Sequence, residues 1–120
     1  LARLNAAAVL VALGRFEEAK THYTQVADGS DIVARGAALG KAQAEMRAGQ
    51  YDAAIDGLKA LRADATTAMP VDGVLMELAR AYRGSGKLDD ARKTLTEIVE
   101  KHAESPFAAE ARAELDKFSS

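Results

Sequence analysis

The stretch Gly84-Ser85-Gly86-Lys87 is the part of the chain that comes nearest to a nucleotide-binding motif. A phosphate-binding loop needs a further glycine five residues before its Gly-Lys pair, a Ser or Thr after the lysine to hold magnesium, and a preceding β-strand. Ala81 stands where that glycine is needed, Leu88 replaces the Ser or Thr, and the residues before the stretch have a helical pattern. We therefore predict a turn between two helices here and no nucleotide site.

Two histidines and two acidic pairs are the other candidates for chemistry. His22 and His102 fall in different predicted helices without a cluster of further ligands, and the chain has no cysteine, so no metal site is expected. Glu17-Glu18 and Asp89-Asp90 fall in the first turns of predicted helices, where carboxylates stabilise the helix dipole. Because no carboxylate pair is placed for general acid–base chemistry, we predict a protein that is not an enzyme and needs no cofactor.

The elements that position these residues follow from a six-residue phrase, glycine–any–large apolar–any–any–alanine, which occurs three times. The copies begin at Gly14, Gly49 and Gly86, 35 and 37 residues apart. A period near 34 residues is typical of stacked helix–turn–helix units, each of which buries its apolar face against its neighbours. Such units form surfaces that hold other molecules, which indicates a binding function.

Each position of the phrase has an expected role. The glycine ends one helix in left-handed dihedrals, which cost glycine no Cβ strain. The apolar residue two places on is expected to fill the wedge between the two helices of a hairpin, and the alanine allows those helices to approach closely. These positions are Phe16, Tyr51 and Leu88 for the wedge, and Ala19, Ala54 and Ala91 for the close approach.

Apolar periodicity and turn residues divide the chain into seven predicted helices. Their ranges are 1–13, 16–27, 31–48, 51–63, 72–84, 88–102 and 106–118. Ser30 and Ser105 are expected to cap the helices that follow them, with Pro106 at a first helical position.

The chain of 120 residues is predicted to form one domain. Its repeats are expected at about 1–29, 30–66 and 72–104, followed by a C-terminal capping helix at 106–118. Because Leu1 already lies within an amphipathic pattern, without an initiator Met or a signal segment, we expect a fragment of a longer protein.

The charge balance bears on the choice of partner. Charged residues make up 28% of the chain and the formal net charge is −2, so no basic surface is expected and nucleic acid is not a predicted partner. No run of about 18 apolar residues occurs, so no membrane span is predicted within these residues. The expected partner is a protein or a peptide, and self-association through an exposed terminal hairpin is an alternative.

The repeated phrase resembles the tetratricopeptide repeat, whose motif combines a small residue in the first helix with a later glycine, an aromatic residue and an alanine. The resemblance covers residues 1 to about 118, although the first-helix tryptophan is missing and Leu88 replaces the aromatic residue. It implies an all-α, right-handed α-solenoid of three helix hairpins plus a C-terminal capping helix. It also implies a non-catalytic scaffold that binds a partner protein or peptide.

Three stretches are similar to tetratricopeptide proteins of the bacterial cell envelope. Residues 1–4 with 12–14, and residues 70–82, look like the ancillary subunit of the SecYEG translocon, while residues 101–111 look like Tol-Pal coordinators and outer-membrane assembly lipoproteins. The likeness implies a domain on the periplasmic side of a bacterial membrane, tethered by an upstream segment. A cytoplasmic location, and a regulatory or targeting domain of a larger enzyme, are the alternatives.

In tetratricopeptide domains the first helices of successive repeats line a concave groove, and the Gly-x-aromatic register transfers that face to this chain. The positions implied for a peptide-binding groove are Leu4, Ala8, Val11, Leu39, Gln43, Met46, Arg47, Met76, Glu77, Arg80 and Arg83. Leu39, Met46 and Met76 are apolar beyond the needs of the core, and methionine adapts to varied partner shapes. The alternative is that these three side chains pack against a neighbouring first helix.

Two details narrow the expected ligand. The family's clamp for chaperone C-terminal carboxylates is absent, because Leu4, Ala8, Gly40, Gly73 and Glu77 occupy its positions. Arg80 and Arg83 share a helix face and are candidates for partner contacts. The alternative is a solvated face on which Glu77 pairs with Arg80 and Arg83 faces water.

Overall fold

The computed structural model describes residues 14–27, 32–63 and 71–118. Within these ranges the chain forms helices and no strand. The helices are α2 (Phe16–Ala27), α3 (Ile32–Arg47), α4 (Tyr51–Ala63), α5 (Val71–Gly84), α6 (Leu88–Lys101) and α7 (Ala108–Phe118). Each lies within two residues of a predicted range. The predicted helix 1–13, the cap at Ser30 and the connection 64–70 lie outside the described residues.

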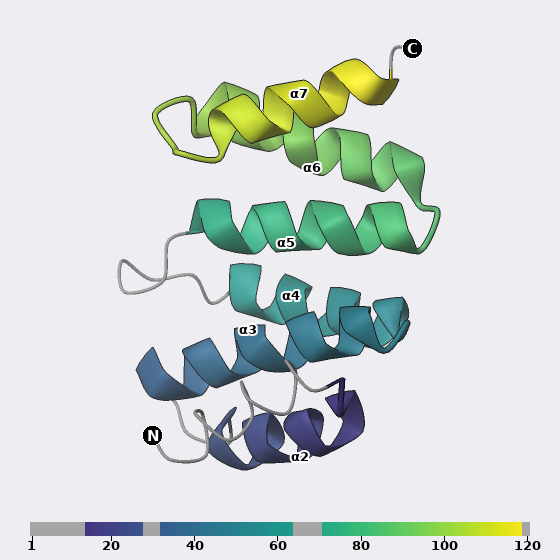
Figure 1. The fold of residues 1–120 in the computed structure, drawn as a ribbon. Coiled ribbons are helices and arrows are strands. Elements are labelled where there is room, and N and C mark those ends of the chain that lie inside the picture. Colours follow the sequence, from purple (N-terminus) through teal and green to yellow (C-terminus); the bar gives the residue numbers. More distant parts are fainter. Residues whose placement is uncertain (1–13, 28–31, 64–70, 119–120) are drawn as a thin grey trace.

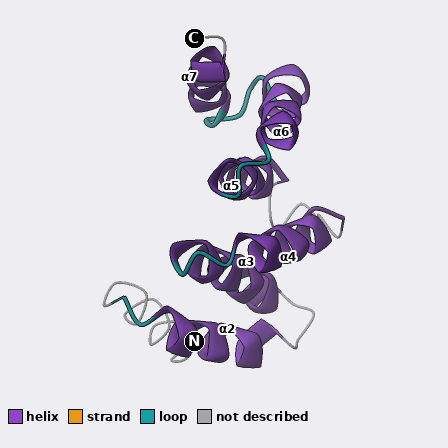
Figure 2. Cartoon of the chain, turned by 90° about the vertical axis from the view of Figure 1, so that its right-hand side faces the viewer, coloured by secondary structure: helices purple, strands orange, loops and turns teal. Residues whose placement is uncertain are grey.

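The helices stack one on another in the order of the sequence (Figure 1). The first helices of the hairpins, α3 and α5, lie in one layer with α7, and the second helices, α4 and α6, lie in a layer behind them (Figures 1 and 2). Each helix packs mainly against the helices that precede and follow it. The prediction of an all-α helical repeat solenoid is therefore confirmed.

The three phrase glycines adopt the predicted left-handed conformation, with φ of 78° at Gly14 and 80° at both Gly49 and Gly86. At the end of α3, the Gly49 amide donates to the Met46 carbonyl and the next amide donates to the Glu45 carbonyl. This pair of hydrogen bonds forms a Schellman motif, which satisfies carbonyls that would otherwise lack a partner at a helix end. The same pattern recurs at Gly86. Each glycine therefore ends one helix and turns the chain into the next.

The core consists of the small and aliphatic side chains that the helical pattern selects. Ala19, Ala54 and Ala91 are each 0% exposed, which confirms close helix approach at all three copies of the phrase. One face of each second helix is also buried. The buried apolar residues are Ala54, Ile55, Leu58 and Leu61 on α4, and Ala91, Leu95 and Ile98 on α6. Alanines at the contacts explain how the helices lie close without large side chains between them.

The prediction for the wedge residues is wrong at Leu88, whose side chain is 48% exposed. Tyr51, the corresponding residue of the second repeat, lies against Gly84 of α5. An aromatic ring at this position can reach the hollow that a glycine leaves on the next first helix. Leucine has no such ring and remains at the surface.

The start of α7 differs from the prediction by two residues. The Ser105 hydroxyl accepts a hydrogen bond from the Phe107 amide at 3.0 Å, as expected of a cap, but Pro106 and Phe107 form a turn and the helix begins at Ala108. The same hydroxyl donates to Asp72 Oδ2 at 2.5 Å. Ser105 thus joins the start of α7 to the start of α5, and this contact accounts for the short turn.

A charged cluster joins α2 to α3. Glu45 is only 5% exposed, and its carboxylate lies 3.5 Å from Lys20 Nζ. Lys20 also donates to the Gln50 side chain, which in turn donates to Glu17 at 2.6 Å. A buried carboxylate needs such partners, because its removal from water is costly.

No helix in the described ranges is long and apolar enough to cross a membrane.

Candidate functional site

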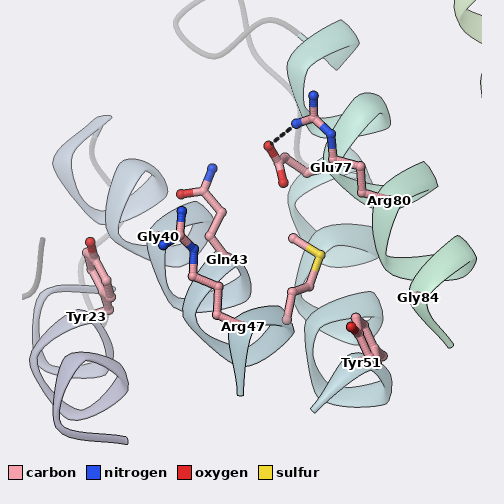
Figure 3. A pocket seen from close by; sticks show the side chains of 9 residues that line it. Tyr23, Gly40, Gln43, Arg47, Tyr51, Glu77, Arg80 and Gly84 are labelled. Atoms are coloured by element: carbon pink, nitrogen blue, oxygen red, sulfur yellow. Dashed lines mark hydrogen bonds and ion pairs between the residues drawn. The ribbon is translucent and has the colours of Figure 1, made fainter. Parts of the chain in front are cut away.

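A hollow of about 720 Å³ lies between α3 and α5, and we call it the central groove (Figure 3). Its lining residues are Tyr23, Gly40, Gln43, Met46, Arg47, Tyr51, Glu77, Arg80 and Gly84. Ligand sites typically have volumes of about 300–1,000 Å³. The central groove is therefore large enough to receive part of another molecule.

Two further hollows adjoin the central groove. One, of about 460 Å³, has mostly apolar walls and shares Gln43 and Glu77 with it. Its other lining residues are Leu39, Asp72, Gly73, Val74, Pro106 and Phe107. The other, of about 110 Å³, lies between α5 and α7 and shares Arg80. The shared residues make the three hollows one continuous surface over the layer that contains α3, α5 and α7.

Glycines in the middle or at the end of helices shape the central groove. A Cβ at Gly40 would lie 2.5 Å from the Tyr23 ring, and one at Gly84 would lie 2.7 Å from Tyr51 Cζ. These two tyrosine rings occupy the space that the missing side chains leave. Sequence reasoning assigned neither tyrosine nor Gly84 to the groove, and it named Gly40 only as a position of the absent carboxylate clamp. A glycine inside a helix lowers helix stability by about 1 kcal/mol relative to alanine. A glycine at position 40, in the middle of a predicted helix, was therefore the available sequence signal that another group approaches the backbone closely there.

Ion pairs hold the charged side chains at the α5 side of the groove. Arg80 Nη1 lies 2.7 Å from Glu77 Oε1, and its Nη2 lies 2.7 Å from Glu110 Oε1 on α7. Burial alone would lower the pKa of the Arg80 guanidinium, but its hydrogen bonds to Glu110 and Glu77 and their negative charges outweigh burial and raise it. Arg83 donates to Glu114, also on α7. The two arginines therefore connect the third repeat to the capping helix.

The α3 side of the groove differs from the α5 side. Arg47 is exposed and has no ion-pair or hydrogen-bond partner among residues 14–27, 32–63 and 71–118. Gln43, one helical turn earlier, likewise makes no hydrogen bond within these residues. Both side chains project from α3, and the Arg47 side chain leans toward Gly40 and away from α5 (Figure 3). As far as the described residues go, the groove thus presents an unpaired cation and an unpaired amide on one helix.

The predicted groove residues are largely brought together. The predicted residues that line the three adjoining hollows are Leu39, Gln43, Met46, Arg47, Met76, Glu77, Arg80 and Arg83. Leu4, Ala8 and Val11 lie outside the described residues.

Three predictions about individual residues need correction or refinement. Met76 lines the small hollow between α5 and α7, but it is only 1% exposed and packs in the core with Leu75 and Leu95, as the alternative of core packing expects. Leu39 and Met46 are half-buried and pack against the core as well as lining hollows, so they serve both packing and surface. Arg83 does not simply face water but pairs with Glu114.

The described residues contain no group of three or more His, Cys, Asp or Glu side chains arranged to hold a metal ion. His102 is half-buried at the end of α6, where its amide donates to the Ile98 carbonyl.

Two family models describing the tetratricopeptide repeat match the chain, one over residues 4–68 and one over residues 72–115. No curated protein and no solved structure matches it significantly. The first match alone spans more than half of the sequence, and both agree with the stacked hairpins described above. The chain therefore belongs to the tetratricopeptide repeat family, whose members are generally non-catalytic modules for protein–protein interaction.

Proposed function

We propose that this domain binds an extended segment of a partner protein along the central groove. The observation that carries the proposal is the open hollow of about 720 Å³, to which two helices from successive repeats both contribute. Gln43 and Arg47 of α3 line this space together with Glu77 and Arg80 of α5. A surface built from separate repeats can contact a peptide at several points along its length.

The lining combines apolar and polar side chains, and this combination suits a peptide ligand. Met46 and the Tyr51 ring offer apolar contact, while the Gln43 amide can both donate to and accept from a peptide backbone. Buried methionine and aromatic contacts supply affinity, and a few polar groups set orientation.

Photocrosslinking in cells tests the proposal. A photoreactive phenylalanine analogue placed at Gln43 is expected to crosslink a partner protein, whereas the same analogue at Lys93, on the outer helix α6, is expected not to. The crosslinked segment is then identified by mass spectrometry. Crosslinks from position 93 and none from position 43 would move the binding site to the outer face.

The proposed location is the bacterial cell envelope. There this domain would lie on the periplasmic side of the membrane, tethered by a segment upstream of these 120 residues. The support is the likeness of residues 1–4, 70–82 and 101–111 to envelope tetratricopeptide proteins. Protease protection of the full-length protein in spheroplasts tests this. Digestion from the outside supports a periplasmic domain, and protection until the membrane is lysed would indicate a cytoplasmic one.

A further inference from the structure

We propose that the central groove selects a peptide that carries an aspartate or glutamate side chain opposite Arg47. This inference rests on the proposed function and adds the chemical class of the ligand to it. It commits to an acidic side chain within an extended segment, and not to a free carboxyl terminus.

The charges around the three adjoining hollows support this choice. Three arginines line these hollows, but Arg80 already pairs with Glu77 and Glu110, and Arg83 pairs with Glu114. Arg47 alone among these three has no carboxylate partner in the described part of the chain. Residues 1–13, the segment expected to form the neighbouring first helix, contain no Asp or Glu. A carboxylate from a bound peptide would supply the partner that residues 14–27, 32–63 and 71–118 do not.

The net charge of the central groove agrees with an acidic ligand. Its lining contains two arginines and one glutamate, Glu77, whose side chain is 15% exposed and whose charge Arg80 balances at 2.7 Å. An incoming carboxylate therefore meets uncompensated positive charge at Arg47, and an incoming ammonium meets no free carboxylate in the lining. Charge complementarity of this kind sets specificity more than affinity.

The spacing on α3 defines the position of the acidic residue. Gln43 and Arg47 are four residues apart, so they lie one above the other on the same helix face, about 6 Å apart. An extended peptide advances about 3.3 Å per residue. A backbone amide held by Gln43 is therefore about two residues from the side chain that reaches Arg47. Met46, between them in sequence, lies on the groove wall and offers apolar contact to a neighbouring side chain.

Three pools of fluorescein-labelled nonapeptides provide the test. Both ends are blocked, the central residue is Glu, Gln or Lys, and the other positions hold the same mixture of Ala, Leu, Met, Ser and Thr. Fluorescence anisotropy with the parent domain is expected to show the Glu pool binding about fivefold more tightly than the Gln pool in low salt, and the Lys pool binding most weakly. The preference for Glu is expected to shrink as sodium chloride is raised, because salt screens an exposed ion pair.

Variants assign the preference to one side chain. Arg47→Gln is expected to remove the difference between the Glu and Gln pools, and Arg47→Lys to retain part of it. Arg112→Gln, at an exposed arginine on α7 that lines none of the three hollows, is expected to leave it unchanged. Circular dichroism melts establish that each variant is folded.

The outcomes separate the two proposals. If the parent binds the Glu and Gln pools equally, and Gln43→Ala weakens both, the groove binds peptides but the acidic preference is wrong. If a peptide with a free carboxyl terminus and no acidic side chain binds as tightly as the Glu pool, the ligand is a terminal carboxylate and the inference is overturned. If no pool binds, both the proposed function and this inference fail.

Discussion

Two junctions between helices use the same kind of contact in different surroundings. Between α2 and α3, Lys20 pairs with Glu45, and their side chains are 20% and 7% exposed. Between α5 and α7, Arg80 pairs with Glu110, and their side chains are 44% and 45% exposed. The second pair is the shorter, at 2.7 Å against 3.5 Å. Burial, and not distance, decides how much each ion pair contributes to stability. Water screens the exposed charges, whereas a buried charge has no water around it and depends on its partner.

The largest expected effect follows from removing the partner of the buried carboxylate. Lys20→Met leaves Glu45 without its cation, and we expect the free energy of unfolding to fall by about 3 kcal/mol. Lys87→Met is the matched control, since Lys87 pairs with Asp52 at 3.3 Å while both side chains are largely exposed. Urea denaturation measures both. Equal losses in the two variants would show that burial does not distinguish the pairs.

The next effect tests how closely the helices approach at the two junctions. A Cβ added at Gly40 would lie 2.5 Å from the Tyr23 ring, whereas one at Gly73 would meet only Phe107, at 3.7 Å. We expect Gly40→Ala to lower the free energy of unfolding by about 2 kcal/mol through overpacking. Gly73→Ala is expected to raise it by about 0.5 kcal/mol, because alanine is the better helix former. Thermal melts that rank the two variants in the opposite order would contradict the tight contact at α2–α3.

A smaller effect is expected from reversing charge at the exposed junction. In the variant Arg80→Glu/Arg83→Glu, both new carboxylates face Glu110 and Glu114 of α7, so we expect a loss of about 1 kcal/mol at low salt. The loss is expected to shrink in 1 M sodium chloride, in contrast to that of Lys20→Met. Urea denaturation at the two salt concentrations provides the measurement. A loss of about 3 kcal/mol that salt does not reduce would place this junction in the same class as α2–α3.

The smallest effect concerns Tyr23, whose pKa burial at the α2–α3 junction raises above 10.0. The unfolded chain then loses the phenol proton more readily than the folded chain does. The stabilisation is present below pH 10 and is lost as the pH rises through the folded pKa. We expect parent stability to fall more steeply above pH 10 than that of Tyr23→Phe, which keeps the ring over Gly40. Parallel curves for the two proteins would show that the phenol ionises equally easily in both states.

Much of the fold could be predicted because it depends on contacts close in sequence. The turns at Gly49 and Gly86 are set by residues within one helical turn, and both have the predicted conformation. The burial of the alanines could be predicted equally well, because Ala54 and Ala91 occupy the same position of a repeated phrase.

The differences from the prediction have another cause. The roles of Leu88 and Met76 were assigned from the register of the repeat, but their burial depends on which helix covers them. Leu88 is exposed where a tyrosine ring would reach the next helix, and Met76 is almost fully covered although it lines the hollow between α5 and α7. Periodicity identifies a helix face, whereas the depth of burial on that face depends on the neighbours.

The sequence by itself determined the repeat, the helices and the residues at their turns, because these follow from periodicity and backbone preference within about 35 residues. Only the tertiary structure decided which charges are satisfied. Arg80, Arg83 and Arg47 are alike as residues on an inner helix face, yet the first two meet glutamates of α7 about 30 residues away and the third meets none in the described chain. Helix stacking brings those glutamates close to Arg80 and Arg83, and no local sequence pattern specifies which arginine forms an ion pair with them.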